Sequence, residues 1–169
     1  MQQLPLQTNI TTIAALAAKR VNENDRFRDF LKQQDSDALD AIVFELNDTI
    51  APQIDCTTCG NCCRSFMINV TVEEAENLST HLQMPLAALK EKYLEESAQG
   101  QMIVNSIPCS FLTGTICSIY EYRFDGCREF PHLHRPHFNG RLFGVLMYYA
   151  TCPIIFNVIE ELKQRTGFK

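Results

Sequence analysis

The sequence has no long apolar run, no cationic leader and no excess of basic residues. Its first residues, 1–9, contain neither a positively charged segment nor an apolar stretch, so we expect no signal peptide. No run approaches the roughly 20 apolar residues of a membrane-spanning helix, so we expect no membrane partner. Lys and Arg number 15 against 20 Asp and Glu, which argues against a nucleic-acid partner. These absences predict a cytoplasmic protein whose partner is another protein or a small molecule.

The sequence also lacks the motifs of two common enzyme classes. It contains no Gly-x-Gly-x-x-Gly nucleotide loop, and its spacing reveals no Ser/His/Asp arrangement. The chain has 169 residues, of which 46% are hydrophobic, so it is long enough to form one domain with a real core. A chain of this length therefore does not need a metal to compensate for a small hydrophobic core.

Cysteine is the residue that stands out. The chain has eight, and four of them lie within eight consecutive, otherwise polar residues: Cys56, Cys59, Cys62 and Cys63. A Cys-x-x-Cys step on a tight turn lets two sulfurs face one metal ion, and Gly60 supplies the permissive backbone for such a turn. Adjacent Cys62 and Cys63 should leave the backbone in different directions, which favours two metals or the two sides of one cluster. Buried apolar cysteines and a disulfide framework are the alternatives.

A second group of cysteines follows at wider spacing. Cys109, Cys117 and Cys127 are separated by steps of eight and ten residues, with turn residues between them, as expected when distant loops converge on a metal. Cys152 stands directly before Pro153 at a predicted helix start. We therefore predict that all eight cysteines are metal ligands.

Two further sets of side chains accompany the cysteines. Arg64, Arg123 and Arg128 are candidates to donate hydrogen bonds to the sulfurs, and the alternative is that they are solvated surface residues. Three histidines follow Cys127 and could supply a nitrogen ligand or belong to a polar loop: His132, His134 and His137. Their spacing matches no standard zinc pattern.

The aromatic residues near the second group are expected to have packing roles. Tyr120 and Tyr122 should flank the site, and His81 is expected to be an ordinary surface or core residue. Catalytic residues and residues that bind an organic cofactor are not identified by any pattern in the sequence.

Hydrophobic periodicity predicts helices over residues 10–51, with Asp35 as the cap of the last one. Residues 71–74, Thr-Val-Glu-Glu, match a capping box at the start of another helix. Short strands are expected near 66–70 and 102–107. Residues 141–150 follow an Asn-Gly turn signal and suit either a returning strand or a helix.

Together these patterns predict a mostly α fold with short β segments. We expect a small single domain organised around a cysteine-ligated metal site. Residues 1–52 should form an N-terminal helical segment packed on the same domain, and residues 53–169 a cysteine-cluster metal-binding domain.

With both cysteine groups in view, the sequence resembles the YkgJ-like cysteine-cluster family, whose signature is Cys-x-x-Cys-x-x-Cys-Cys. The resemblance rests on residues 56–63 and on three later segments: Cys109-Ser-Phe-Leu, Cys117-Ser-Ile-Tyr-Glu-Tyr-Arg and Cys127-Arg-Glu-Phe-Pro. Phe124 stands where members of the family often carry Pro. The resemblance implies chelation of zinc or iron. A flagellin lysine methylase is similar in its cysteine cluster and is linked to an iron-sulfur centre.

Zinc and iron-sulfur clusters both accept four thiolates, so the donor set alone does not separate them. We favour zinc slightly, in a structural role, over iron or an iron-sulfur cluster. The alternatives are an iron-sulfur enzyme, such as a methyltransferase related to the flagellin lysine methylase, and a thiol redox protein that carries no metal. We leave open whether the chain is an enzyme.

Overall fold

Three helices form the N-terminal part of the chain. The computed structural model describes residues 5–169, and these helices are α1 (Ile10–Lys19), α2 (Val21–Leu31) and α3 (Ser36–Ile50). The Asp35 carboxylate accepts a hydrogen bond of 2.9 Å from the Ala38 amide, which satisfies one of the unpaired donors at the start of α3. The predicted helices and the Asp35 cap are confirmed.

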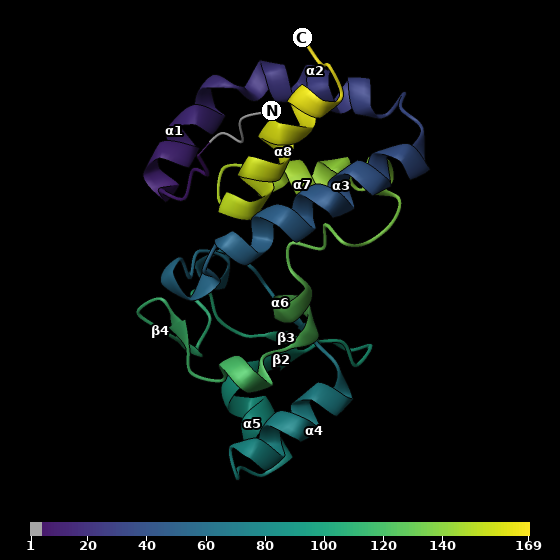
Figure 1. Cartoon of the computed structure of the whole chain (residues 1–169). Helices are drawn as coiled ribbons and strands as arrows, with labels where there is room; N and C mark the ends of the chain where they lie inside the picture. Colours follow the sequence, from purple (N-terminus) through teal and green to yellow (C-terminus); the bar gives the residue numbers. More distant parts are fainter. Residues whose placement is uncertain (1–4) are drawn as a thin grey trace. The chain divides into compact units, whose positions relative to one another are not determined.

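The C-terminal part of the chain contributes α7 (Leu142–Met147) and α8 (Pro153–Arg165). The apolar run at 141–150, which suited a strand or a helix, is therefore helical over residues 142–147 and continues as a turn. Pro153 occupies the first turn of α8, where its missing N–H costs nothing, and Gly167 follows the end of the helix at a φ of +68°. α8 packs against α1 and α3 (Figure 1), and most of its length is buried.

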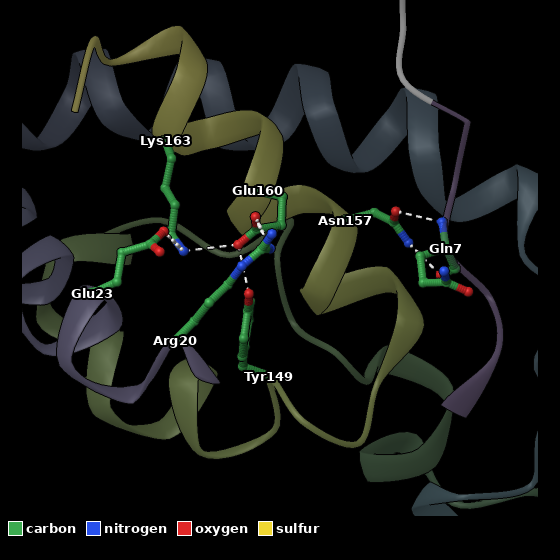
Figure 2. Close-up of polar contacts among 7 residues, drawn as sticks. All are labelled: Gln7, Arg20, Glu23, Tyr149, Asn157, Glu160 and Lys163. Atoms are coloured by element: carbon green, nitrogen blue, oxygen red, sulfur yellow. Dashed lines mark hydrogen bonds and ion pairs between the residues drawn. The ribbon is translucent and has the colours of Figure 1, made fainter. Parts of the chain in front are cut away.

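A polar network joins α2 to α8 inside this helical part (Figure 2). The Lys163 side chain is only 7% exposed, and its Nζ donates hydrogen bonds to Glu23 at 2.6 Å and Glu160 at 2.8 Å. Tyr149 donates to Glu160 at 2.6 Å, and Arg20 forms an ion pair with the same carboxylate. Burial raises the pKa of the Tyr149 hydroxyl. The buried ammonium is thus paired with two carboxylates, as a buried charge must be.

The middle of the chain holds all the strands in the part of the structure that is described, and each of them is short. β1 (Asn69–Val70), β3 (Met102–Val104) and β2 (Leu94–Glu96) form an antiparallel sheet in that order. β4 (Leu112–Thr113) and β5 (Ile116–Cys117) form a hairpin, with Leu112 opposite Cys117. The predicted strands at 66–70 and 102–107 exist, but they extend only over residues 69–70 and 102–104.

Three helices accompany these strands: α4 (Val72–His81), α5 (Leu86–Tyr93) and α6 (Asp125–Glu129). The predicted capping box is present, because Thr71 accepts from the Glu74 amide and the Glu74 carboxylate accepts from the Thr71 amide. A small apolar core fills the space between these elements: Val70, Ala75, Leu78, Leu89, Leu94, Met102, Val104, Phe111, Ile119 and Phe124.

The described residues form one small, mostly helical domain with short strands, which consists of two compact units. We call residues 5–55 and 131–169 the helical unit and residues 56–130 the cysteine unit. Over residues 5–169, none of the helices combines the length and the apolar character required to cross a bilayer. The domain boundary between residues 52 and 53 stays a prediction.

Candidate metal centre

The first cysteine group lies on two short 3₁₀ helices, η2 (Cys56–Thr58) and η3 (Cys62–Arg64). The Cys56 carbonyl accepts hydrogen bonds of 3.2 Å from the amides of Cys59 and Gly60, which closes the first Cys-x-x-Cys turn. Gly60 has a φ of +59°, and a Cβ at this position would lie 3.0 Å from the Thr115 backbone. Glycine is therefore required twice over, by its backbone conformation and by the close approach of the β4–β5 turn.

The second cysteine group folds onto the first within the cysteine unit. The Cys109 amide donates a hydrogen bond of 2.8 Å to the Cys63 carbonyl. The Arg64 guanidinium donates to the Cys59 carbonyl at 2.9 Å and to the Gly114 carbonyl at 2.6 Å. One side chain thus joins the loop of the first group to the hairpin that carries Cys117.

The two groups enclose a hollow of about 140 Å³. Six cysteines are among the residues that line it: Cys56, Cys62, Cys63, Cys109, Cys117 and Cys127. Three of them, Cys109, Cys117 and Cys127, also pack against the apolar core of the unit. Segments up to 71 residues apart in sequence, from 56 to 127, therefore contribute to one hollow, as the spacing of the second group predicted.

Cys62 and Cys63 both line this hollow, although they are adjacent in sequence. Neighbouring side chains point to opposite faces of a strand, but in a 3₁₀ turn they are separated by only about 120°. Cys63 also receives a hydrogen bond from the Cys62 side chain. Both thiols therefore border one hollow, although their side chains leave the backbone in different directions.

The remaining two cysteines differ from these six. Cys59 belongs to the same loop but is not among the residues that line the hollow. Cys152 lies in the helical unit, where it is buried at the N-terminus of α8. No disulfide joins any of the eight, all of which lie within the described residues. As the side chains stand in residues 5–169, no three His, Cys, Asp or Glu residues are grouped closely enough to hold a metal ion.

The thiols of the hollow differ in acidity. The hydrogen bond from Cys62, aided by the charge of Arg64, lowers the pKa of Cys63 to about 6 in spite of its burial. Burial raises the pKa of Cys109 and of Cys117, and it raises that of Cys127 to about 12, with the negative charge of Cys63 contributing. Several neighbouring thiolates are therefore unfavourable here unless a cation joins them.

The arginines near the cysteines donate mainly to backbone carbonyls. Besides the two bonds of Arg64, Arg123 donates to the Tyr120 carbonyl at 2.5 Å, and its guanidinium lies 3.8 Å from the centre of the Tyr120 ring. Arg128 donates to the carbonyls of Glu121 and Arg123 at 3.2 and 3.1 Å. These contacts fix the loops that carry the thiols, and the charges of Arg64 and Arg123 favour the thiolate form of nearby cysteines.

The three histidines lie in the helical unit, in the loop after Pro131. His132 and His137 have positive φ angles, and the rings of His132 and His134 are 6.5 Å apart. The buried carboxylate of Asp40 accepts hydrogen bonds from the amides of His137 and Phe138 at 2.6 and 2.8 Å. These two hydrogen bonds hold the loop in place. The sequence shows Asp40 only as an acidic residue within an apolar helical stripe, which does not predict its role.

Sequence reasoning also missed a second hollow in the cysteine unit. It has a volume of about 720 Å³ and a largely polar lining, and it shares Arg123 and Arg128 with the thiol hollow. His81 stacks on Tyr122 at its edge, with the ring centroids 3.5 Å apart. Tyr122 thus packs near the site, as expected, and its packing partner is the exposed imidazole of His81.

A small domain in which two cysteine groups border one hollow defines a cysteine-cluster protein. The family model CxxCxxCC, described as "Putative zinc- or iron-chelating domain", matches residues 55–152, which is more than half of the chain. The chain therefore belongs to the CxxCxxCC family. Searches of the curated proteins and of the solved structures gave no match.

Proposed function

We propose that the cysteine unit holds zinc or iron through thiolates of the two cysteine groups, with zinc slightly favoured and the metal in a structural role. The observation that carries this proposal is the hollow lined by six thiols from four separate segments. Zinc and iron-sulfur centres both take four cysteine sulfurs, so six provide enough for one centre. The bound metal would cross-link the two groups and neutralise their thiolates.

The proposed ligand set remains all eight cysteines, and the structure supports its members to different degrees. The six that line the hollow have the strongest support. Cys59 shares their loop and lies three residues from Cys56 and three from Cys62. Cys152 has the support of the family match, which ends at this residue.

Anaerobic purification followed by elemental analysis and a visible spectrum tests this proposal. A stoichiometric amount of zinc and a colourless protein are expected for the leading form of the proposal. A brown protein whose absorption is lost in air identifies the iron-sulfur form. Absence of both metals from protein that was never exposed to air or to chelators contradicts the proposal as a whole.

A second candidate is an iron-sulfur enzyme, and the polar hollow of 720 Å³ favours it. An enzyme needs room for a substrate beside its metal, and this hollow shares two arginines with the thiol hollow. Methyl transfer is the reaction class that the sequence resemblance suggested. A colourless, air-stable zinc protein counts against this candidate.

A third candidate is a metal-free thiol redox protein, which the low pKa of Cys63 favours, because the thiolate is the reactive form of cysteine. It predicts reversible disulfides among the thiols of the hollow. Native mass spectrometry separates the two cases, since a metal adds its own mass and each disulfide removes two hydrogens.

A further inference from the structure

An apolar groove lies in the helical unit, and neither cysteine group takes part in it. It has a volume of about 450 Å³, and α1 and α2 form one wall while α7 and the turn after it form the other. Three large apolar side chains at this groove are strongly exposed: Val21 at 57%, Phe143 at 75% and Met147 at 56%. A cluster of exposed apolar side chains around a hollow is typical of an interaction surface.

The two walls differ in side-chain size. The wall on α1 carries Ala14, Ala17 and Ala18, whereas the wall on α7 carries Phe143, Leu146 and Met147. The lining residues on α1 are Ala14, Ala17 and Ala18, and those on α2 are Val21, Asn24, Asp25 and Arg28, so within each helix they lie on one face. The surface therefore offers both a recess of small side chains and large side chains that fit one.

A surface with both features is complementary to a copy of itself. When two copies meet about a two-fold axis, the same patch is used on each, and residue i of one contacts residue j of the other in both directions. Phe143 and Met147 of each copy can then cover the alanines of the other. No second protein is needed to explain the shape.

The charges in the groove are compatible with the same arrangement. Asp25 and Arg28 are the charged residues of its lining, and Arg28 Nη1 lies 3.2 Å from Asp25 Oδ1, so the two charges of the lining cancel. Arg28 also lies 3.4 Å from Asp29. An axis close to this pair brings Asp25 of each copy to Arg28 of the other. Two opposed ion pairs related in this way attract one another.

We propose that this groove is the interface of a symmetric homodimer, in which Phe143 packs on the alanine wall and Asp25 pairs with Arg28 across the two-fold axis. The proposal does not depend on the metal, because every residue that carries it lies in the helical unit. Failure of the metal proposal would therefore leave it unaffected.

Sedimentation of the full, metal-loaded chain over a range of concentrations tests the proposal. The wild type should change from monomer to dimer as its concentration rises. Arg28→Asp places two negative residues at the axis and Asp25→Arg places two positive ones, so each variant alone should dimerise at least about tenfold more weakly, the effect of 1.4 kcal/mol. An equimolar mixture of the two should regain the affinity, because opposite charges then meet.

Matched controls separate this pairing from a change in net charge. Arg26→Asp and Asp48→Arg alter the net charge equally at exposed positions outside the groove lining, and both should dimerise like the wild type. Phe143→Glu should abolish the dimer while thermal unfolding stays unchanged.

Three results would overturn the proposal. The first is a wild type that stays monomeric at its highest soluble concentration. The second is a dimer that survives in Phe143→Glu and in both charge variants. The third is a mixture of the two charge variants that does not reassociate. Binding of a vesicle or of another protein by a monomeric wild type would identify a different occupant and would equally reject self-association.

Discussion

At the scale of single residues, Gly60 determines the path of the first cysteine loop. Its φ of +59° and its approach to Thr115 both exclude a side chain. We predict that Gly60→Ala lowers the free energy of unfolding by about 1–3 kcal/mol and reduces metal retention, because the loop must move away from the β4–β5 turn. Chemical unfolding together with metal analysis measures both effects.

Gly114→Ala is the matched control for this change. Gly114 has a similar φ of +65°, but a Cβ there would meet no atom within 4 Å. It therefore reports backbone strain alone, and the excess loss in Gly60→Ala reports the contact with Thr115. Equal losses in the two variants would show that this contact does not matter.

The cysteine positions could be predicted at this scale, but the directions of their side chains could not. Clustering at residues 56–63 and the later spacing were sufficient to indicate that two groups converge. That Cys62 and Cys63 line one hollow depends on a single 3₁₀ turn, which spacing does not determine. Likewise, arginines near cysteines were visible in the sequence, whereas their backbone acceptors are set by the fold.

At the scale of elements, Glu74 connects the start of α4 to the start of α6. Its carboxylate accepts from the Thr71 amide at 2.8 Å and from the Asp125 amide at 2.6 Å. We predict that Glu74→Ala costs about 2 kcal/mol of stability and Thr71→Ala about 1 kcal/mol, because Glu74 satisfies donors at two helix starts and Thr71 at one.

Urea unfolding of the two variants tests this prediction, and Glu73→Ala on the exposed side of the same turn is the control. Because α6 carries Cys127, Glu74→Ala should also slow metal uptake relative to Thr71→Ala. An equal effect of the two cap variants would show that the bond to Asp125 contributes nothing.

The link between α2 and α8 should make stability depend on pH. The hydrogen bond from Lys163 lowers the pKa of Glu23 in the folded chain. The stabilisation from this hydrogen bond is complete above about pH 4.3, the pKa of a glutamate in the unfolded chain. It is lost as the pH falls through the lower pKa that Glu23 has in the folded chain. We predict that Glu23→Gln costs about 1 kcal/mol at neutral pH, a value reduced by the partial exposure of Glu23.

Unfolding in urea at a series of pH values from neutral to strongly acidic checks this dependence. The wild type and Glu23→Gln should converge in stability at the acidic end. Asp48→Asn, which removes an exposed carboxylate from α3, should follow the wild type throughout. A difference between the wild type and Glu23→Gln that persists in acid would contradict the assignment.

Element types were largely predictable, because helical periodicity and two caps are local signals. Residues 10–51, the Asp35 cap and the Thr71 capping box all follow from sequence neighbours. The apolar run at 141–150 had no such signal, and its helix over residues 142–147 packs against α2 in the helical unit. The strands are two or three residues long, which is too short for alternation to define their ends.

At the scale of the whole molecule, the family match spans parts of both units, from residue 55 to residue 152. Sequence order could not predict that residues 131–169 rejoin the N-terminal helices in one unit. That grouping comes from long-range packing of α8 on α1 and α3. As a result, the three histidines and Cys152 belong to the helical unit, whereas the six cysteines of the hollow belong to the cysteine unit.

The central claim is that the two cysteine groups bind metal together. The most direct test is the metal content per chain, after anaerobic purification, of the wild type, Cys63→Ser from the first group and Cys109→Ser from the second. The account predicts a stoichiometric amount of zinc or iron in the wild type and its loss in both variants. Full metal content in either variant, or no metal in the wild type, would contradict it.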